Sequence, residues 1–329
     1  MQRTLTLTVN SWPLRQRFAI ARGSKIAADT ISVAISENGH TGFGEAVPYQ
    51  RYGESMETVS AAIEGVQAAI EGGLSRSDLQ DALLPGAARN ALDCALWDLQ
   101  AKQTGIAAWQ TAGLAALQPQ TSAYTIVLDD ALRMAERAAA AQAYPLLKIK
   151  LGGADGLMSD ITRLSAIAEA RPDAQLIVDS NEGWQADELA RYADKLGQFG
   201  VSFFEQPVPQ AQEAALNAIS LPFCADESVH DSSDIAALPE AYSWVNIKLD
   251  KTGGLTEAQA CIKAAWAADK KIMIGCMVAS SLAIAPAMLL AQQADMIDLD
   301  GPLFLTEDCP HGLRYDGAQI FPPDPKLWG

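Results

Sequence analysis

Along the first part of the chain, hydrophobic and polar positions follow the period of strands before they follow the period of helices. Residues 3–9 alternate between apolar and polar side chains, which is typical of a strand with one buried face. Residues 29–47 predict a β-hairpin that turns at Asn38 and Gly39, because Asn-Gly favours the tight turn between antiparallel strands. Strands followed by helices indicate a small α+β domain over residues 1–120. The predicted helices of this domain span residues 54–72 and 87–104.

From about residue 121 onward, short β-rich runs alternate with alanine-rich helical stretches. Neighbouring runs are 21 to 29 residues apart, which leaves room for one helix in each connection. Because parallel strands need such crossover helices, the pattern predicts a (β/α)7β barrel over residues 121–305. The expected fold class is α/β, a modified TIM barrel with an α+β capping domain, and residues 306–329 are expected to return to the cap. The eight runs centre near Ile126, Ile149, Val178, Phe204, Ala225, Ile247, Ile274 and Leu299.

Six of the eight predicted strands end in ionisable side chains. In β/α barrels the chemistry takes place at the carboxyl ends of the strands. Residues two apart on a strand share a face, so Lys148 and Lys150 are expected to point the same way, as are Asp298 and Asp300. One charged strand end is usually a solvated side chain or a helix cap. Six of them in a regular array predict a functional site at the barrel mouth.

Strands 3, 4 and 5 of the predicted barrel are neighbours, and each supplies one carboxylate: Asp179, Glu205 and Asp226. Three converging carboxylates cannot all stay ionised unless a cation lies among them. A site built from oxygen ligands, without histidine or cysteine, favours a hard ion. Mg²⁺ is therefore the expected cofactor.

Two lysines are expected to face each other across the mouth, because Lys150 and Lys248 belong to strands 2 and 6 in a ring of eight. Amines on opposite sides of one carbon suit stereochemical inversion, in which one removes a proton and the other returns one to the opposite face. Lys148 lies about 6.6 Å from Lys150 along the strand, and the repulsion is worth about 2.5 kcal/mol at an effective dielectric constant of about 20. This repulsion favours the neutral form that a base needs.

Composition narrows the class of partner. The chain has 24 Lys+Arg and 40 Asp+Glu, a formal net charge of −16, and such a surface repels phosphate backbones and anionic lipid. Its start lacks the apolar block of a secretory signal. Its five cysteines are scattered, which is typical of a reduced, cytoplasmic protein. We therefore expect a small-molecule substrate, with neither nucleic acid nor a membrane as partner, and the composition is compatible with a homo-oligomer.

The Lys-x-Lys pair, the carboxylates on three successive strands and the later lysine together resemble the enolase superfamily, and more narrowly its muconate-lactonizing-type subgroup. The resemblance covers essentially the whole chain, cap included. It implies that Asp179, Glu205 and Asp226 are the Mg²⁺ ligands. It also implies that Lys150 and Lys248 are the acid/base pair.

The same resemblance implies supporting roles around this centre. Lys148 would stabilise the enediolate and tune Lys150, and Asn181 and Glu227 would support the ligands without contacting the ion. The segment 298–302, Asp-Leu-Asp-Gly-Pro, is similar to the Asp-x-Asp motif with which dipeptide epimerases bind the ammonium of their substrate. A dipeptide presents its carboxylate, its α-carbon and its ammonium in the order of the metal, the lysine pair and strand 8.

Two segments of the cap, near residues 20–25 and 48–53, resemble the lids that cover the mouth in this family. The resemblance implies that Arg22 meets an acidic side chain on the C-terminal residue of the dipeptide, with a surface arginine as the alternative. It also implies that Thr125 and Cys276 contact the dipeptide, and a small buried residue is the alternative for Cys276.

The expected function is a Mg²⁺-dependent dipeptide epimerase that inverts the α-carbon of the C-terminal residue of an Ala-Glu-type dipeptide from peptidoglycan recycling. Other reactions of the subgroup are alternatives on the same scaffold: those of a cycloisomerase, an o-succinylbenzoate synthase or an N-acylamino acid racemase. A binding barrel that holds a metal without turnover is an alternative of another class.

Overall fold

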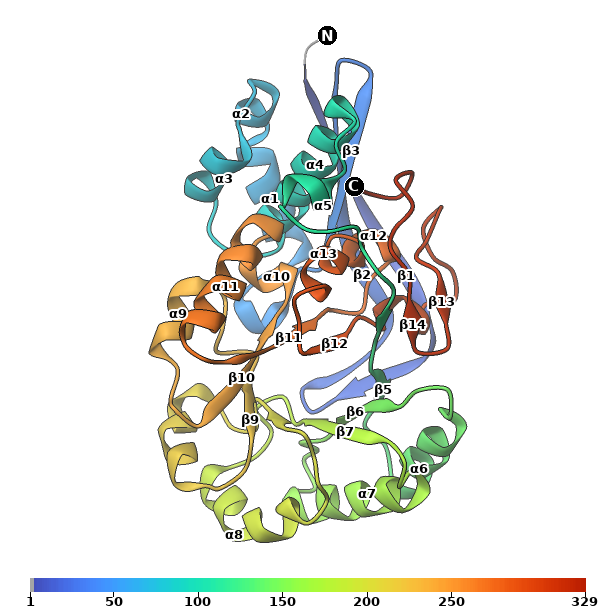
Figure 1. The fold of residues 1–329 in the computed structure, drawn as a ribbon, viewed down its shortest axis with the longest axis vertical. Helices are drawn as coiled ribbons and strands as arrows, with labels where there is room; N and C mark the ends of the chain where they lie inside the picture. Colours follow the sequence, from blue (N-terminus) through green and yellow to red (C-terminus); the bar gives the residue numbers. More distant parts are fainter. Residues whose placement is uncertain (1–2) are drawn as a thin grey trace.

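The computed structural model describes residues 3–329 and contains an eight-stranded parallel sheet with an antiparallel cap (Figure 1). The strands pair in chain order, β5 to β12, and the Ala123 N–H donates to the Ile297 carbonyl at 2.8 Å, which joins the last strand to the first. The predicted modified barrel is confirmed. Its strands are β5 (Tyr124–Ile126), β6 (Leu146–Lys150), β7 (Gln175–Asp179), β8 (Phe204–Glu205), β9 (Phe223–Ala225), β10 (Tyr242–Ile247), β11 (Lys271–Gly275) and β12 (Met296–Asp298).

Helical connections cover the outside of the barrel, and one differs from the expected pattern. The connection after β8, η2 (Gln210–Ala218), is a 3₁₀-helix rather than an α-helix. The last β-rich run was expected to centre near Leu299, which lies one residue beyond β12. The other connections are α6 (Ala131–Ala140), α7 (Leu157–Ala170), α8 (Ala186–Gly197), α9 (Ser232–Ala237), α10 (Leu249–Thr252), α11 (Leu255–Ala267), α12 (Ser281–Ile284) and α13 (Ala287–Ala291). Within residues 3–329, none of the helices is both long and apolar enough to cross a membrane.

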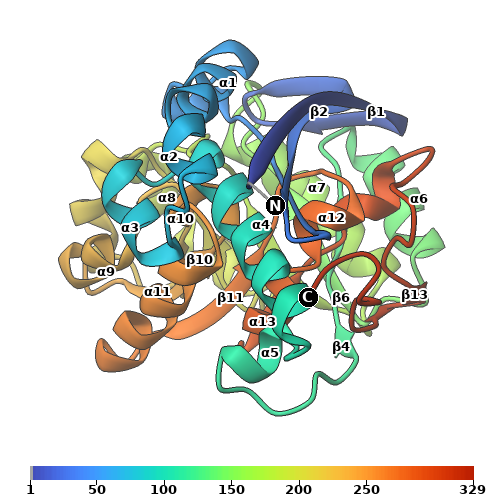
Figure 2. The same cartoon turned by 90° about the horizontal axis from the view of Figure 1, so that it is seen from above.

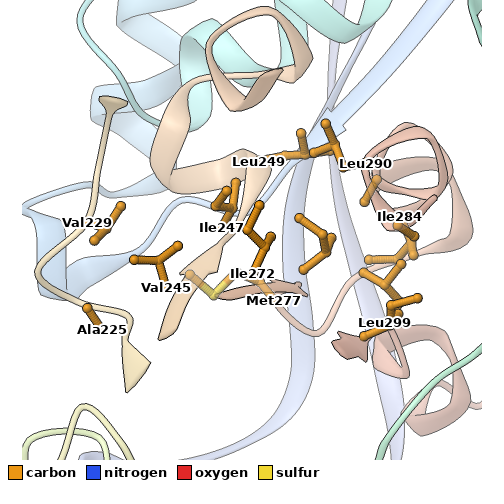
Figure 3. Close-up of a cluster of buried hydrophobic side chains, with 14 of the residues drawn as sticks. Ala225, Val229, Val245, Ile247, Leu249, Ile272, Met277, Ile284, Leu290 and Leu299 are labelled. Atoms are coloured by element: carbon orange, nitrogen blue, oxygen red, sulfur yellow. The ribbon is translucent and has the colours of Figure 1, made fainter. Parts of the chain in front are cut away.

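Side chains alternate along each barrel strand between an outer and an inner layer. On β10, Val245 and Ile247 belong to the apolar layer beneath the outer helices, which Figure 3 shows in part. Trp244 belongs to a separate apolar cluster with one member from each strand or the residue beside it. A polar side chain follows two residues further along in every case but that of Met273, which Gly275 follows, so an apolar plug lies below a polar layer. The plug consists of Ala123, Leu146, Ile177, Phe203, Cys224, Trp244, Met273 and Met296.

The cap begins with three antiparallel strands, and the hairpin predicted at Asn38 and Gly39 is confirmed, since both have positive φ (52° and 84°). The first strand is longer than the predicted 3–9, because its second half packs against the barrel through Phe18 rather than within the cap. The helix predicted over 54–72 is divided at Val66. The elements are β1 (Thr4–Ile20), β2 (Gly23–Glu37), β3 (His40–Ala46), η1 (Gln50–Tyr52), α1 (Met56–Gly65), α2 (Gln67–Glu71), α3 (Arg76–Ala82), α4 (Ala87–Thr104) and α5 (Ala108–Thr111).

Seen from above, α4 and the β1–β2 hairpin lie over the barrel (Figure 2). Asp93 of α4 accepts hydrogen bonds from the backbone N–H and the hydroxyl of Thr256 at 2.9 and 2.6 Å. Asn90 donates to Asp250, which also accepts from the Val47 N–H, both at 2.9 Å. The cap therefore holds the segment that directly follows β10.

The C-terminal segment returns along the outside of the molecule to the same helix. The Trp328 indole donates to the Cys94 carbonyl at 3.0 Å, and the Gly329 N–H donates to Asp98 at 2.8 Å. These bonds place the end of the chain against α4. The remaining short elements are β4 (Gln120–Thr121), η3 (Gly301–Phe304), β13 (Tyr315–Asp316) and β14 (Gln319–Ile320).

Gly44 on β3 packs directly against α4, and a Cβ added there would collide with the Ala91 carbonyl oxygen. We expect Gly44→Ala to lower the free energy of unfolding by about 1–3 kcal/mol, as overpacking does. Gly65→Ala is the matched control, because a Cβ there meets nothing within 4 Å and should stabilise α1 by about 0.5–1 kcal/mol. Urea unfolding measures both, and equal stabilities for the two variants would contradict the prediction.

Candidate active site

Three carboxylates meet at the mouth because they end neighbouring parallel strands. Asp179 ends β7, Glu205 ends β8 and Asp226 follows β9. All three are buried, and they bring one oxygen each within 4.8 Å of the others. Oxygen ligands on opposite sides of one Mg²⁺ would be about 4.2 Å apart, given a Mg–O distance of about 2.1 Å. The cluster therefore has the size and the donor atoms that one hard cation requires.

A lysine stands at each end of this row of carboxylates. Lys150 ends β6 and lies 2.6 Å from Asp179 Oδ2, while Lys248 follows β10 and lies 2.6 Å from Asp226 Oδ2. Since β6 and β10 flank β7, β8 and β9, the two amines approach the centre from opposite sides. Burial alone would raise the pKa of Asp179, but Lys150 and Lys148 hold it well below its usual range.

Lys148 is fully buried beneath the other two lysines and is surrounded by acids. Its Nζ lies 2.8 Å from Glu205 Oε2, 2.9 Å from Asp298 Oδ2 and 3.3 Å from Asp179 Oδ2. Burial lowers the pKa of Lys148, but these carboxylates raise it well above its ordinary value, with Asp298 contributing most. The positive charge of Lys148, which was expected to repel Lys150, is thus largely compensated by these three carboxylates.

Two further residues of this centre were not found from the sequence. Lys251 Nζ lies 2.6 Å from Asp226 Oδ1 and donates to the Asn246 carbonyl at 2.9 Å, and Asn246 donates to Glu205 at 2.8 Å. Asn246 shares a strand face with Lys248, so strand alternation could have found it. Lys251 lies on α10, and no strand period reaches it. A Cβ on Gly275 would be 2.6 Å from Asn246 Oδ1, so only glycine leaves room there.

The Asp-x-Asp pair faces the same cavity from β12. Asp300 accepts a hydrogen bond from the Thr125 N–H at 2.6 Å, so Thr125 holds this carboxylate through its backbone. Burial and the neighbouring Asp298 raise the pKa of Asp300 to about 7. Asp298 Oδ1 is buried and has no hydrogen-bond partner within residues 3–329. A substrate ammonium at this pair would contact the free oxygen of Asp298 and favour the ionised form of Asp300.

The segment near residues 20–25 is the tight tip of the β1–β2 hairpin rather than a loop. Its Arg22 pairs with Glu227 at 2.6 Å and with Glu182 at 3.3 Å, and it donates to the Tyr49 hydroxyl at 2.9 Å. Arg22 is thus bound to the barrel and to the other cap segment. Asn181 donates to the same Glu227 at 3.2 Å.

The segment near residues 48–53 contains the short helix η1. Its Arg51 forms two hydrogen bonds to Glu182, both 2.7 Å. The two cap segments are therefore held closed over the mouth by one network of ion pairs.

A cavity of about 500 Å³ lies between these cap segments and the barrel mouth, which is within the range of small-molecule sites. Asp179 and Glu205 lie beneath it rather than in its wall. Burial raises the pKa of the Cys276 thiol well above its usual value, so the thiol stays neutral. The cavity wall includes these predicted residues: Arg22, Thr125, Lys148, Lys150, Asn181, Asp226, Glu227, Lys248, Cys276, Asp298 and Asp300.

The capped barrel places two lysines beside a cluster of three carboxylates that can bind a cation. This arrangement defines an enzyme class that transfers protons next to a bound cation. Residues 2–113 match the family "Mandelate racemase / muconate lactonizing enzyme, N-terminal domain", and residues 130–324 match "Enolase C-terminal domain-like". The chain therefore belongs to the enolase superfamily, in the group of mandelate racemase and muconate lactonizing enzyme.

Characterised relatives cover nearly the whole chain. It is 43% identical to the L-Ala-D/L-Glu epimerase of Escherichia coli K12, with 97% of this chain and 99% of that protein covered. It is 42% identical to the N-acetyl-D-glutamate racemase of a Pseudoalteromonas species, with 91% and 95% covered.

Solved structures of dipeptide epimerases and of one related protein have the same fold as this chain over nearly its whole length. An enolase family member from Agrobacterium tumefaciens, with bound sodium and L-Ala-L-Glu, superposes with a TM-score of 0.96 at 45% identity and covers 99% of this chain and 100% of that one. Three dipeptide epimerases that are 26% to 30% identical were each solved with Mg and a dipeptide, with TM-scores of 0.88 to 0.91.

Cation binding should release a proton from the cluster. Burial and Asp179 raise the pKa of Glu205 to about 8, and Glu205 must be ionised to act as a ligand. Mg²⁺ affinity should therefore rise between about pH 7 and about pH 9, and calorimetry in buffers of different ionisation enthalpy should detect the released proton. Binding without proton release would contradict this assignment.

The stability of the cation-free protein provides a second readout. The pKa of Glu205 in the folded protein lies above its value of about 4.3 in the unfolded chain. Its contribution to the free energy of unfolding is therefore complete below about pH 4.3 and is lost as the pH rises toward 8. Glu205→Gln should remove the share of this dependence that belongs to Glu205 and leave the share of Asp300, whose pKa is also raised. The control Glu169→Gln, at an exposed position of α7, should keep both.

Proposed function

We propose that this protein is a Mg²⁺-dependent isomerase that inverts the α-carbon of the C-terminal residue of a dipeptide. The observation that carries the proposal is the placement of Lys150 and Lys248 at opposite ends of one carboxylate cluster. A substrate carbon between two such amines can lose a proton to one and gain a proton from the other. The epimerase relatives support the same reaction.

The carboxylates and the lysines of the site have different roles in this reaction. Asp179, Glu205 and Asp226 would hold Mg²⁺, which supplies positive charge to the substrate carboxylate as the α-proton leaves. One of Lys150 and Lys248 removes that proton, and the other delivers a proton to the opposite face.

The residues around this centre hold it in shape. Lys148 supplies a permanent positive charge between Glu205 and Asp298. Lys251 fixes the orientation of Asp226, and Asn181 and Glu227 support the mouth beside the metal ligands.

The far end of the cavity decides between two substrate classes. The Pseudoalteromonas relative is named as a racemase of N-acetyl-D-glutamate, an amino acid without a free ammonium. In this chain the unpartnered oxygen of Asp298, beside the buried Asp300, favours a positively charged end. A dipeptide supplies that charge, so an N-acylamino acid is the second candidate.

The domain division and the location of the protein also remain proposals. A cap over residues 1–120 that precedes a barrel over 121–305 is supported by the two separate family matches. A tail over 306–329 that returns to the cap is supported by the hydrogen bonds of Trp328 and Gly329 to α4. A cytoplasmic location is supported by five cysteines that form no disulfide. A role in peptidoglycan recycling belongs to the same proposal and is supported by the likeness to the L-Ala-D/L-Glu epimerase.

Incubation of L-Ala-L-Glu with the Mg²⁺-loaded protein in D₂O should invert the second residue and place deuterium at its α-carbon, as followed by NMR and mass spectrometry. Lys150→Ala and Lys248→Ala should each reduce epimerisation by about 10²–10⁴-fold, the range that acid–base groups contribute. Each variant should keep α-proton exchange for only one of the two epimers, because one amine remains on one face. Binding of the dipeptide without any exchange in the wild type would reject catalysis.

Asp298→Asn should lower kcat/KM for L-Ala-L-Glu by about 10–100-fold, since it weakens a charge-assisted contact to the ammonium. N-acetyl-L-glutamate is the matched substrate without that ammonium. If it is the better substrate of the wild type, and if its turnover is unaffected by Asp298→Asn, the dipeptide assignment is wrong and the N-acylamino acid assignment replaces it.

A further inference from the structure

Glu213 is a buried acidic residue that the reaction described above does not use. It lies on η2, the 3₁₀-helix that follows β8, and only 4% of it is exposed. Within residues 3–329 its side chain accepts hydrogen bonds from three neutral groups: Gln206 Nε2, the Ser228 hydroxyl and the Tyr242 hydroxyl. Burial and Glu213 raise the pKa of Tyr242 well above its usual value, so this hydroxyl keeps its proton and donates. All three donors converge on one oxygen, Oε1, which therefore fixes three neighbouring side chains.

The first of these side chains, Gln206, contacts all three segments that carry the metal-binding carboxylates. It follows Glu205 directly, and its carbonyl accepts a hydrogen bond from the Glu182 N–H at 2.8 Å, three residues after Asp179. Its side-chain oxygen accepts from the Asp226 N–H at 2.9 Å. The φ of Gln206 is 35°, in the left-handed region, which persists in a non-glycine residue only where the surroundings enforce it. Gln206 thus joins the ends of β7, β8 and β9.

The amide of Gln206 can make these bonds in only one orientation. Backbone N–H groups only donate, so the amide oxygen must face those of Asp226 and Ser228, and the NH₂ group must face the other way. On that side Glu213 accepts from Nε2 at 2.7 Å, the shortest of the bonds that this nitrogen makes. An acceptor at Glu213 therefore favours the orientation in which Gln206 holds the Asp226 backbone.

The position of Asp226 matters because a metal site tolerates only small displacements of its ligands, about 0.2 Å in each metal–ligand distance. Asp226 supplies one of the three oxygens of the cluster and also faces Lys248 at 2.6 Å. We propose that Glu213 is a positioning residue of the cation site: through Gln206 it fixes the turn that carries Asp226, so that the three carboxylates meet at the spacing that one Mg²⁺ requires. This inference rests on the proposed function and names a further residue of its metal site.

The experiment measures the affinity for Mg²⁺ by calorimetry in the absence of substrate. Glu213→Met keeps the approximate size of the side chain but removes the acceptor. It should weaken Mg²⁺ binding by about 10-fold, the lower end of the range for groups that orient metal ligands. Glu213→Gln keeps an oxygen that can accept from Gln206 and should retain most of the affinity. The Mg²⁺ concentration that gives half-maximal α-proton exchange should rise in Glu213→Met by the same factor.

Two further variants separate positioning from a general loss of stability. Gln212→Met is the matched control on the same helix, because Gln212 accepts from the Ala186 N–H at 2.9 Å and does not contact Gln206. It should lower the stability of the protein without changing its Mg²⁺ affinity. Gln206→Met should weaken Mg²⁺ binding by about 10–100-fold, and adding Glu213→Met to it should cause no further loss, because Glu213 acts through Gln206.

An unchanged Mg²⁺ affinity in Glu213→Met would overturn the inference, as would an equal loss in Gln212→Met or losses that add in the double variant. Thermal unfolding verifies that each variant is folded. If Gln206→Met does not fold, the two variants of Glu213 still decide, since equal losses in Glu213→Met and Glu213→Gln would contradict a role for the acceptor oxygen. A wild type that binds Mg²⁺ but exchanges no α-proton of any dipeptide in D₂O would instead reject the proposed epimerase function and leave the positioning role standing.

Discussion

The active site depends on one electrostatic constraint, the compensation of charge in a buried space. Six buried carboxylates gather at the mouth with four buried lysines, and Arg22 pairs with one of these carboxylates, Glu227, which leaves an excess of one negative charge when every group is ionised. Burial makes uncompensated charge costly, so the site must take up cations or protons. The raised pKa values of Glu205 and Asp300 express this excess at the two ends of the site. A divalent metal would relieve it at one end, and a substrate ammonium would relieve it at the other.

The cap completes this arrangement in two ways. From above, Asp93 and Asn90 hold the segment that follows β10, so the position of Lys248 depends on contacts between the cap and the barrel. Over the mouth, Arg22 and Arg51 close the cavity by pairing with acids at the strand ends. The barrel supplies the charged residues of the mouth, and the cap closes the cavity above them.

Much of the barrel chemistry could be predicted because strand geometry is local. Alternation along β6 predicted that Lys148 and Lys150 share a face, and regular spacing predicted that β7, β8 and β9 are neighbours. The length of β1 could not be predicted, since Phe18 in its second half packs against Val127 and Phe304, which are distant in the sequence. Lys251 was missed for the same reason: its contact with Asp226 depends on the turn that follows β10.

The sequence by itself determined the order of the strands, the inward face of each and the kind of charge that each strand end carries. These properties follow from a two-residue period and from the need of parallel strands for crossover helices. Only the tertiary structure decided which charges are paired and which are free. Arg22 and Glu227 are 205 residues apart in the chain, and Lys25 is three residues from Arg22, yet within residues 3–329 only Arg22 of these two cations has a carboxylate oxygen within 4.0 Å. Pairing depends on distances of a few ångströms between separate elements, and no local pattern of residues specifies such distances.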